Sequence, residues 1–589
     1  MNLMNVVTRT IAGIGGIAVV TTPLYAESRP NVIIVLSDDQ GYGDLSCHGN
    51  PLIKTPFMDR LYNQSLCFTD FHVCPMSTPT RGELLTGRDA VENGASAVCQ
   101  GRSMLREDIP TIADMFAAEG YKTVHYGKWH LGDSYPYRPQ DRGFQETIHH
   151  GAFGIQSIAD HYLNKDYWNG HYFDQDDKEV VTDGYCTDVW FDYAINYLNK
   201  RSKDRKPFLM YLALNCAHAP HLVDQKYAEP YMETFKRTPQ LAKFFGQIVN
   251  LDENLGRMME ALAKTGLEDN TILLFMTDNG TCEKGAAEFY NAGMRGHKRE
   301  ALEGGHRVPF FFHWPAGGFS EHREIDELTQ VQDVLPTLLD FCKVPKAKNT
   351  TFSGVSLAPL MKGKVDKLVE RMLVVDYGPS HEEHFSTVMW GKWRLLNTGE
   401  LYNIEDDSHQ DNNVASKYPE IVRKMQLHYD NWWKSVRLSF EKIRRIHIGN
   451  SKSPITPLYC NDWTGSYADN PNNLRRMRGR TGFWPLTVEK SGNYRISIAR
   501  WWFDAQAPIR GTYQKRFPFK DAELSDITQA TISFEGETYG PVQVNVADTE
   551  IVFEVTLKKG NNCLTANFLD AKGEVVCGAP FVKIENYNR

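Results

Sequence analysis

Four short apolar runs recur in the first half of the chain, and polar side chains follow each of them. The runs occupy residues 31–36, 123–126, 207–214 and 271–276. Helical patterns separate them, such as residues 239–265, in which apolar positions recur at helical spacing. Short apolar runs between helices are typical of buried parallel strands, and ligands bind beyond the carboxyl ends of such strands. The pattern predicts an α/β fold with a crevice where the strand ends meet.

The pattern changes beyond residue 440, where apolar and polar side chains begin to alternate. The alternating segments are residues 493–500, 530–534, 542–546 and 551–557. Gly and Asn turns separate them, which is typical of a β-sandwich, for example a jelly roll. Such a domain could bind sugar, border an active site or only pack on the rest of the chain.

Residues 1–26 have the features of a secretory signal peptide. Arg9 precedes an apolar run at residues 11–20, and the segment ends at Ala26. The run is too short to span a bilayer, and no stop-transfer pattern supports the alternative of a membrane anchor. No other apolar stretch approaches transmembrane length. We therefore expect an exported protein with no membrane span in the mature chain.

Charge and cysteine content narrow the possible functions. The net charge of -8 gives no support to binding of nucleic acid or of an anionic membrane surface. An anionic substrate would have to be held by local positive groups. The 11 cysteines form no Cys-x-x-Cys pair and no zinc spacing. Export permits disulfides, although the odd count leaves at least one thiol unpaired.

Residues 74–88 carry the candidate nucleophile. Ser77 stands two residues before Pro79, which suits the first turn of a helix because its missing N–H costs nothing there. Free N–H groups and the helix dipole favour an anion at such a helix start. Arg81 lies one helical turn on and can reach back. The alternative is a surface turn that leads into a helix.

Two strand ends carry oxygen ligands for a cation. Asp38 and Asp39 follow the first apolar run, and Asp278 and Asn279 follow the fourth. Adjacent carboxylates repel each other unless a cation offsets them, and hard oxygen ligands suit calcium or magnesium. The alternative is a solvated turn, because residues 40–43 resemble one. The second oxygen pair favours the metal site.

The other two strand ends carry basic side chains. Lys128 and His130 are separated by one residue, which at a strand end places both on the same side. His218 and His221 follow the third run. A lysine and a histidine on a solvated loop, and structural histidines, are the ordinary alternatives.

Residues 131–185 form a long excursion that is rich in aromatic and histidine side chains. It could be a carbohydrate-facing wall, or a satellite core under a long loop. We expect substrate choice to depend on this segment and on residues 380–384.

In this order, the motifs resemble those of the formylglycine-dependent sulfatases of the alkaline phosphatase superfamily. The likeness covers roughly residues 29–435 and rests on Ser-x-Pro-x-Arg with Leu-Thr-Gly, the early Asp-Asp, Gly-Lys-Trp-His, His-x-Pro-His, Asp-Asn-Gly and the segment 296–309. It implies an alkaline-phosphatase-like mixed sheet with helices on both faces, a smaller C-terminal α+β subdomain, one calcium ion and hydrolysis of a sulfate ester.

The resemblance also implies roles for single residues. Ser77 would be oxidised to formylglycine (3-oxoalanine), and its hydrate would attack sulfur. The residues that would act with it are Arg81, which holds the modified residue; Lys128 and Lys298, on the sulfate; His130, as proton acceptor; His218, as proton donor; and His221, lining the pocket. The calcium ligands would be Asp38, Asp39, the modified Ser77, Asp278 and Asn279. Cys74 fails on spacing and is interpreted as structural.

Serine at position 77, where the family more often has cysteine, implies maturation by the radical enzyme that accepts serine. That points to a bacterium and, with the signal peptide, to the periplasm, with secretion or surface attachment as alternatives. An unmodified Ser77 would resemble a phosphatase or phosphodiesterase nucleophile. The metal-binding histidines of the two-zinc relatives are not evident, which argues against that reading.

We expect residues 27–375 to form the catalytic α/β domain, 376–440 the subdomain, and 441–589 a linker (451–457) and the β-sandwich. The favoured function is removal of sulfate from a sulfated oligosaccharide or polysaccharide of algal or host origin. The alternatives are an arylsulfatase, a phosphomonoester or diester hydrolase, and a non-catalytic glycan-binding protein.

Overall fold

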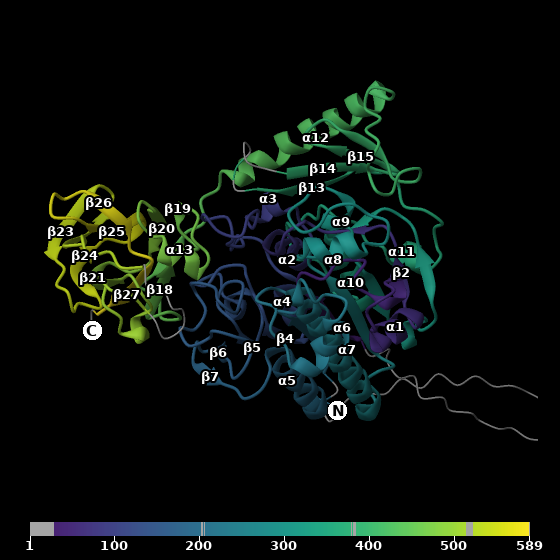
Figure 1. Ribbon diagram of the computed structural model, residues 1–589, viewed down its shortest axis with the longest axis horizontal. Helices are drawn as coiled ribbons and strands as arrows, with labels where there is room; N and C mark the ends of the chain where they lie inside the picture. The colour runs from purple at the N-terminus through teal and green to yellow at the C-terminus, as the bar shows by residue number, and fades with distance from the viewer. Residues whose placement is uncertain are drawn as a thin grey trace, which may run out of the picture.

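The computed structural model describes residues 29–201, 204, 206–378, 380, 385–513 and 522–587 (Figure 1). The predicted signal peptide and residues 381–384 lie outside the described residues. Within these ranges, no helix is long and apolar enough to cross a membrane. All 11 cysteines are described, and none forms a disulfide.

A ten-stranded mixed sheet lies at the centre, in the order β11-β2-β10-β9-β1-β8-β4-β5-β6-β7. Its strands are β1 (Asn31–Ser37), β2 (Leu66–Phe68), β4 (Lys122–Gly127), β5 (Glu146–His149), β6 (His171–Asp174), β7 (Glu179–Val181), β8 (Phe208–Ala213), β9 (Thr271–Thr277), β10 (Phe310–His313) and β11 (Arg323–Ile325). The four predicted apolar runs are β1, β4, β8 and β9, which lie side by side and parallel. A small pair, β3 (Phe71–His72) and β12 (Thr329–Gln330), lies beside this sheet.

Helices cover both faces of the sheet, as predicted. Along β1, Ile33 and Val35 pack into one apolar core with α5 and α7, whereas Val32 and Ile34 pack into another with α2, α4 and α10. The helices are α1 (Pro56–Asn63), α2 (Ser77–Thr86), α3 (Ala90–Asn93), α4 (Ile112–Ala118), α5 (Cys186–Arg201), α6 (Gln225–Met232), α7 (Pro239–Thr265), α8 (Lys284–Phe289), α9 (Glu303–His306), α10 (Val334–Cys342) and α11 (Ala358–Met361). Short 3-10 turns are η1 (Ser46–His48), η2 (Pro139–Arg142), η3 (Pro315–Gly317), η4 (Val331–Asp333) and η5 (Phe503–Ala505).

A smaller antiparallel sheet with one helix follows. It consists of β13 (Leu373–Tyr377), β14 (Phe385–Trp390), β15 (Trp393–Leu396) and β16 (Leu401–Asn403), and α12 (Pro419–Phe440) packs on it. The helix begins at Pro419, since proline is favoured at the first helical position.

The last part of the chain is a sandwich of two sheets around one apolar core. The first holds β17 (Ile446–Ile448), β19 (Thr464–Gly465), β20 (Gly482–Val488), β22 (Gln529–Phe534), β23 (Glu537–Gln543), β25 (Gly560–Leu569) and β26 (Val575–Gly578). The second holds β18 (Ile455–Tyr459), β21 (Gly492–Ala499), β24 (Ile551–Leu557) and β27 (Phe581–Asn586). We call residues 446–587 the β domain.

Two details of the β domain differ from the predictions. The predicted linker at residues 451–457 is wrong at its end, because Ile455–Tyr459 pairs with β27 inside the sandwich. The strand predicted at 542–546 is β23, Glu537–Gln543. It ends early because Asn545 turns the chain, with its backbone N–H donating to Asp548 Oδ2 at 2.7 Å. The domain boundaries near residues 376 and 441 stay predictions.

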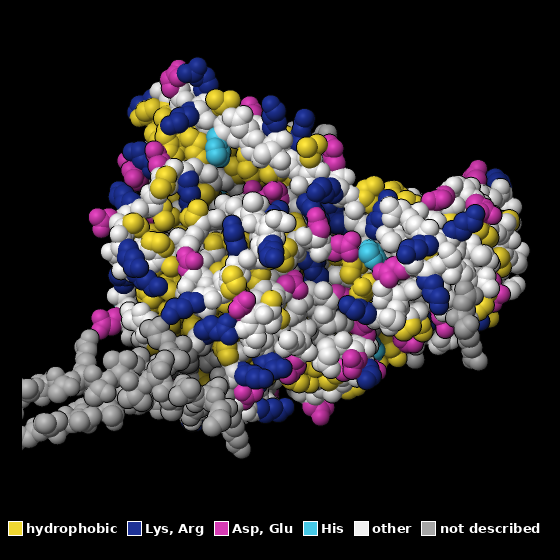
Figure 2. Space-filling model, turned by 180° about the vertical axis from the view of Figure 1, so that it is seen from behind, with side chains coloured by type: hydrophobic (Ala, Val, Ile, Leu, Met, Phe, Trp, Pro, Cys, Tyr) yellow, Lys and Arg dark blue, Asp and Glu magenta, His cyan; other side chains and the backbone are white. Residues whose placement is uncertain are grey.

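The β domain lies against the excursion of residues 131–185 (Figure 1). Tyr137 and Ile158 belong to the same apolar core as the sandwich. Tyr167 and Tyr172 are buried in the core of the central sheet. For these aromatic residues, the contacts favour packing in a core over a role in a carbohydrate-facing wall. On the face seen in Figure 2, Lys and Arg side chains are interspersed with Asp and Glu and form no broad basic patch.

Candidate active site

Two neighbouring strand ends bring three carboxylates together. Ser37 pairs with Thr277 at the ends of β1 and β9, so Asp38 and Asp278 leave the sheet side by side. The backbone N–H of Asp39, at a left-handed φ of 61°, donates to Asp278 Oδ1 at 3.0 Å. Oxygens from all three carboxylates lie within 4.8 Å of one another, and all three side chains are buried. We call Asp38, Asp39 and Asp278 the aspartate cluster.

Three cations balance the aspartate cluster. Lys128, directly after β4, donates through Nζ to Asp38 Oδ2 at 2.7 Å. Arg81 donates through Nη2 to Asp278 Oδ2 at 2.9 Å, and Lys298 contacts Asp39. Burial of an unpaired charge is costly, so each carboxylate needs such a partner inside the protein. The carboxylates and cations come from three strand ends, from helix α2 and from the loop that holds Lys298.

The carboxylates differ in their affinity for protons. Burial raises the pKa of Asp38 to about 7, and the neighbouring Asp278 adds to this effect. Burial also acts against ionisation of Asp39, but Lys298 and His218 hold the pKa of its carboxyl well below the usual value. The cluster therefore combines a firmly ionised carboxylate with one that a further positive charge would ionise fully.

Ser77 is the first residue of α2, as the position of Pro79 predicts. Arg81 Nε donates to Ser77 Oγ at 2.8 Å from one turn further on. The same guanidinium binds Asp278, so Arg81 joins the candidate nucleophile to the aspartate cluster. Cys74 is buried near Glu83, where burial raises the pKa of its thiol well above the usual value. This fits its interpretation as a structural residue.

His130 and His218 lie near the two lysines. Burial, reinforced by Lys128, holds the pKa of His130 well below its usual value. Burial lowers the pKa of His218 to about 3, although Asp39 acts in the opposite direction. His218 Nδ1 lies 2.6 Å from the carbonyl oxygen of Ala219, and its Nε2 lies 3.8 Å from Asp39 Oδ2.

A cavity of about 380 Å³ opens over these groups. Five predicted site residues line it: Ser77, Lys128, His130, His218 and Lys298. His221 does not line it. Its two ring nitrogens instead lie 2.8 Å from Gln247 Oε1 and 2.8 Å from Glu283 Oε1.

Several residues that line the cavity were not predicted from the sequence. From residues 131–185, Phe153, Ile155 and Gln156 line it. Arg299 and, from the β domain, residues 467 and 469–472 line it as well. The only signal in the sequence for the last segment was Asn470-Pro471, which is typical of a helix start.

The residues present fit a hard divalent cation. Asp38 Oδ1 and Asn279 Oδ1 are buried and accept no hydrogen bond within the described residues. Buried acceptors without partners are rare and call for an explanation. Both belong to the predicted ligand set, and oxygen donors are those that calcium and magnesium prefer.

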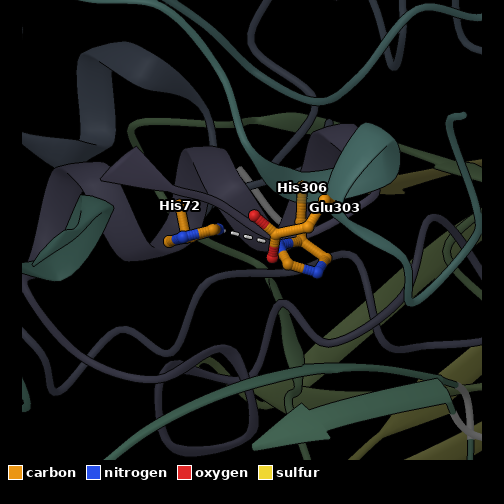
Figure 3. A group of neighbouring side chains, drawn as sticks. All are labelled: His72, Glu303 and His306. Atoms are coloured by element: carbon orange, nitrogen blue, oxygen red, sulfur yellow. Dashed lines mark hydrogen bonds between the residues drawn. The ribbon is translucent and has the colours of Figure 1, made fainter. Parts of the chain in front are cut away.

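A second buried group has similar residues but a different arrangement (Figure 3). His72 Nδ1 lies 2.9 Å from His306 Nδ1, and His72 Nε2 lies 2.8 Å from Asp70 Oδ1. Arg394 donates to Glu303 Oε1 at 2.7 Å and to Asp70 Oδ1 at 2.9 Å. We call these five residues the histidine cluster. None of them lines the cavity over Ser77.

Comparison with known proteins gives a consistent result. A family model described as Sulfatase matches residues 30–344. The chain is 27% identical to human N-acetylgalactosamine-6-sulfatase over 394 residues, covering 62% of this chain and 72% of that protein. It is 30% identical to human arylsulfatase A over 375 residues, covering 57% of this chain and 68% of that protein.

A solved structure gives the same fold. The crystal structure of Ps i-CgsB in complex with k-i-k-neocarrahexaose has a TM-score of 0.63 and 24% sequence identity. The likeness covers 70% of this chain and 100% of that one.

Proposed function

The chain belongs to the sulfatase family and is a sulfuric ester hydrolase, and on that premise we propose that it removes sulfate from a glycan with formylglycine formed at Ser77 and a bound calcium ion. One observation carries the proposal. Ser77 Oγ lies at a helix start, is held by Arg81 at 2.8 Å, and faces a cavity with two lysines over a buried aspartate cluster.

Two similar proteins support a glycan as the substrate. One is named for a sulfatase of N-acetylgalactosamine, and the other holds a neocarrahexaose. Polar residues in the wall of the cavity also favour a glycan, because a sugar presents hydroxyl groups that need donors and acceptors.

Ser77 and Arg81 position the nucleophile. Formylglycine, once formed at Ser77 and hydrated, supplies a nucleophile that can release sulfate by re-forming its aldehyde. Arg81 Nε fixes the oxygen at this position from 2.8 Å away, and its ion pair with Asp278 fixes the guanidinium in turn. The fixed geometry lowers the entropic cost of attack on sulfur.

Lys128 and Lys298 would hold the sulfate oxygens. Both ammonium groups line the cavity and are anchored on Asp38 and Asp39. Positive groups fixed in advance stabilise charge as it shifts during the reaction, without reorganising. Calcium held by Asp38, Asp39, Asp278, Asn279 and residue 77 would supply further positive charge.

His218 would give a proton to the departing alcohol, and His130 would accept one from the nucleophile. With its pKa at about 3, His218 is neutral in the free site. A sulfate ester brings negative charge close to the ring, which favours the protonated form. Its proton-donor state therefore depends on bound substrate.

Export to the bacterial periplasm and maturation by a serine-type radical enzyme complete the proposal. The signal-peptide pattern at residues 1–26 supports export, and Ser77 supports that maturase. Cell fractionation followed by N-terminal sequencing of the mature chain tests both export and the site of cleavage.

The substrate test is sulfate release from a panel. The protein, coexpressed with the maturase, is offered sulfated galactose, N-acetylgalactosamine, glucosamine, fucose and a uronic acid, together with 4-nitrophenyl sulfate and 4-nitrophenyl phosphate. The proposal predicts release from one sugar at one position. Turnover of only the aryl sulfate would favour an arylsulfatase, which the likeness to arylsulfatase A keeps as second candidate. Phosphate release without sulfate release would contradict the proposal.

A further inference from the structure

One wall of the cavity over Ser77 comes from the β domain. Tyr467, Asp469, Asn470 and Asn472 line it together with the catalytic residues. These four side chains offer a phenol, a carboxylate and two amides. The wall comes from a part of the chain that the sulfatase family model does not match, since that match ends at residue 344.

Internal hydrogen bonds fix this wall. The Tyr467 hydroxyl donates to Asp469 Oδ2 at 2.6 Å, and Asn470 Nδ2 donates to Asp469 Oδ1 at 2.6 Å. Asn470 also caps the short helix α13 (Pro471–Arg475), where its Oδ1 accepts from the backbone N–H of Asn472 at 3.1 Å. The side chains of Tyr467, Asp469 and Asn470 are therefore oriented before a ligand arrives.

Contacts across the domain junction hold the wall in place relative to Ser77. The backbone N–H of Ile158 donates to the Asp469 carbonyl at 3.2 Å, and Trp502 Nε1 donates to the Ile158 carbonyl at 2.9 Å. Ser103 Oγ, from the catalytic domain, donates to Asp462 Oδ1 at 3.1 Å. The β domain is thus docked on both sides of residues 467–472.

Part of the wall remains available to a ligand. Tyr467 is 39% exposed. Asn472 is exposed, and its side-chain amide has no hydrogen-bond partner among the residues that the structure describes. An amide both donates and accepts, which matches sugar hydroxyl groups. The ring of 4-nitrophenyl sulfate carries no hydroxyl group and presents only weakly accepting nitro oxygens to such a wall.

We propose that residues 467–472 form a subsite for the hydroxyl-bearing ring of a sulfated sugar, through which the β domain selects sugar sulfates over aryl sulfates. The inference rests on the proposed function, because it assigns the substrate's sugar ring to a wall of the same cavity. Asn472 and Tyr467 contact the ring, and Asp469 and Asn470 position them. Binding groups that act on only one of two substrates change the specificity ratio.

Steady-state kinetics of the full, matured enzyme test the subsite. The variants are Asn472→Ala, the double variant Tyr467→Ala with Asn472→Ala, and Gln543→Ala as a control. Gln543 is an exposed amide on β23 of the same domain that does not line the cavity. The substrates are the sulfated monosaccharide that the wild type turns over best and 4-nitrophenyl sulfate.

With the sugar, kcat/KM is expected to fall about tenfold for Asn472→Ala, the scale of one lost hydrogen bond, and further for the double variant. With 4-nitrophenyl sulfate all variants should stay within about twofold of wild type, which also shows that they fold. Equal losses on both substrates, or no loss on the sugar, would overturn the subsite. A wild type that releases sulfate from neither substrate would instead contradict the proposed function.

Discussion

The aspartate cluster and the histidine cluster both lie inside the protein, and both combine acidic with basic side chains. They differ in their position relative to the cavity over Ser77. In the aspartate cluster, Asp38 Oδ1 and Asn279 Oδ1 have no hydrogen-bond donor within the described residues, and the adjoining lysines line a cavity. In the histidine cluster the hydrogen bonds run from Asp70 through His72 to His306, with Arg394 joining Asp70 to Glu303. Glu303 Oε2 and His306 Nε2 also have no hydrogen-bond partner within the described residues, but no member of this cluster lines the cavity over Ser77.

Buried charge alone therefore does not mark an active site. A buried network that does not line the cavity over Ser77 stabilises one arrangement of the fold. A cluster that leaves acceptors unpartnered beside a cavity can still bind something. Replacing residues in each cluster should therefore affect different properties of the protein.

The largest effect is expected for Asp278→Asn. The change removes one carboxylate from the candidate metal site and the ion-pair partner of Arg81. We expect sulfate release to fall about 10³-fold, the scale for losing a fixed electrostatic group at a reacting centre. Initial rates of sulfate release measure this. A variant with near wild-type rates would show that the aspartate cluster is not catalytic.

Glu303→Gln should act on stability instead. The change leaves buried Arg394 with one carboxylate partner fewer. Breaking a buried ion pair by removing one partner costs about 3–5 kcal/mol of unfolding free energy. Urea unfolding measures the loss, and the folded variant should keep its rate of sulfate release within about fivefold. A large loss of rate with unchanged stability would reverse the comparison.

The effect of calcium on stability should distinguish the two clusters. A ligand at 100 times its dissociation constant stabilises the folded protein by about 2.7 kcal/mol. We expect wild type and Glu303→Gln to gain stability in excess calcium relative to a chelator, and Asp278→Asn to lose that gain. The unfolding midpoint in each condition is the measurement. A calcium effect that disappears only with Glu303→Gln would place the ion in the histidine cluster.

The smallest expected effect is a pH dependence from His306. Burial lowers the pKa of His306 to about 3 from 6.5, so the unfolded chain binds more protons between these values. The stability present above pH 6.5 is therefore lost as the pH falls below it, by roughly 2 kcal/mol at about pH 5. His306→Gln should show a shallower loss in urea unfolding. An identical pH dependence in both proteins would contradict this assignment.

Local patterns predicted the parts of the site that lie at strand ends and helix starts. The apolar runs before Asp38, Lys128 and Asp278 located the strands, and the parallel pairing then placed these residues together. Pro79 located the start of α2 at Ser77. These features depend on residues close in the sequence, which is why periodicity and helix signals reveal them.

The remaining parts depend on contacts between distant segments. Asn470 and Asn472 reach the cavity only because the β domain docks on Ile158 and Ser103. Nothing in the local pattern of residues 467–472 indicates that contact. For the same reason the pairing of Glu303 with Arg394 could not be predicted, since the two lie on separate elements.

The most direct test of the central claim compares sulfate release by wild type and Ser77→Ala, both coexpressed with the serine-type maturase. The assay uses the sulfated sugar that the wild type turns over best. We predict sulfate release by the wild type and a fall of at least about 10³-fold in the variant, because removal of a nucleophile disables the covalent route. Full sulfate release by Ser77→Ala would contradict the account.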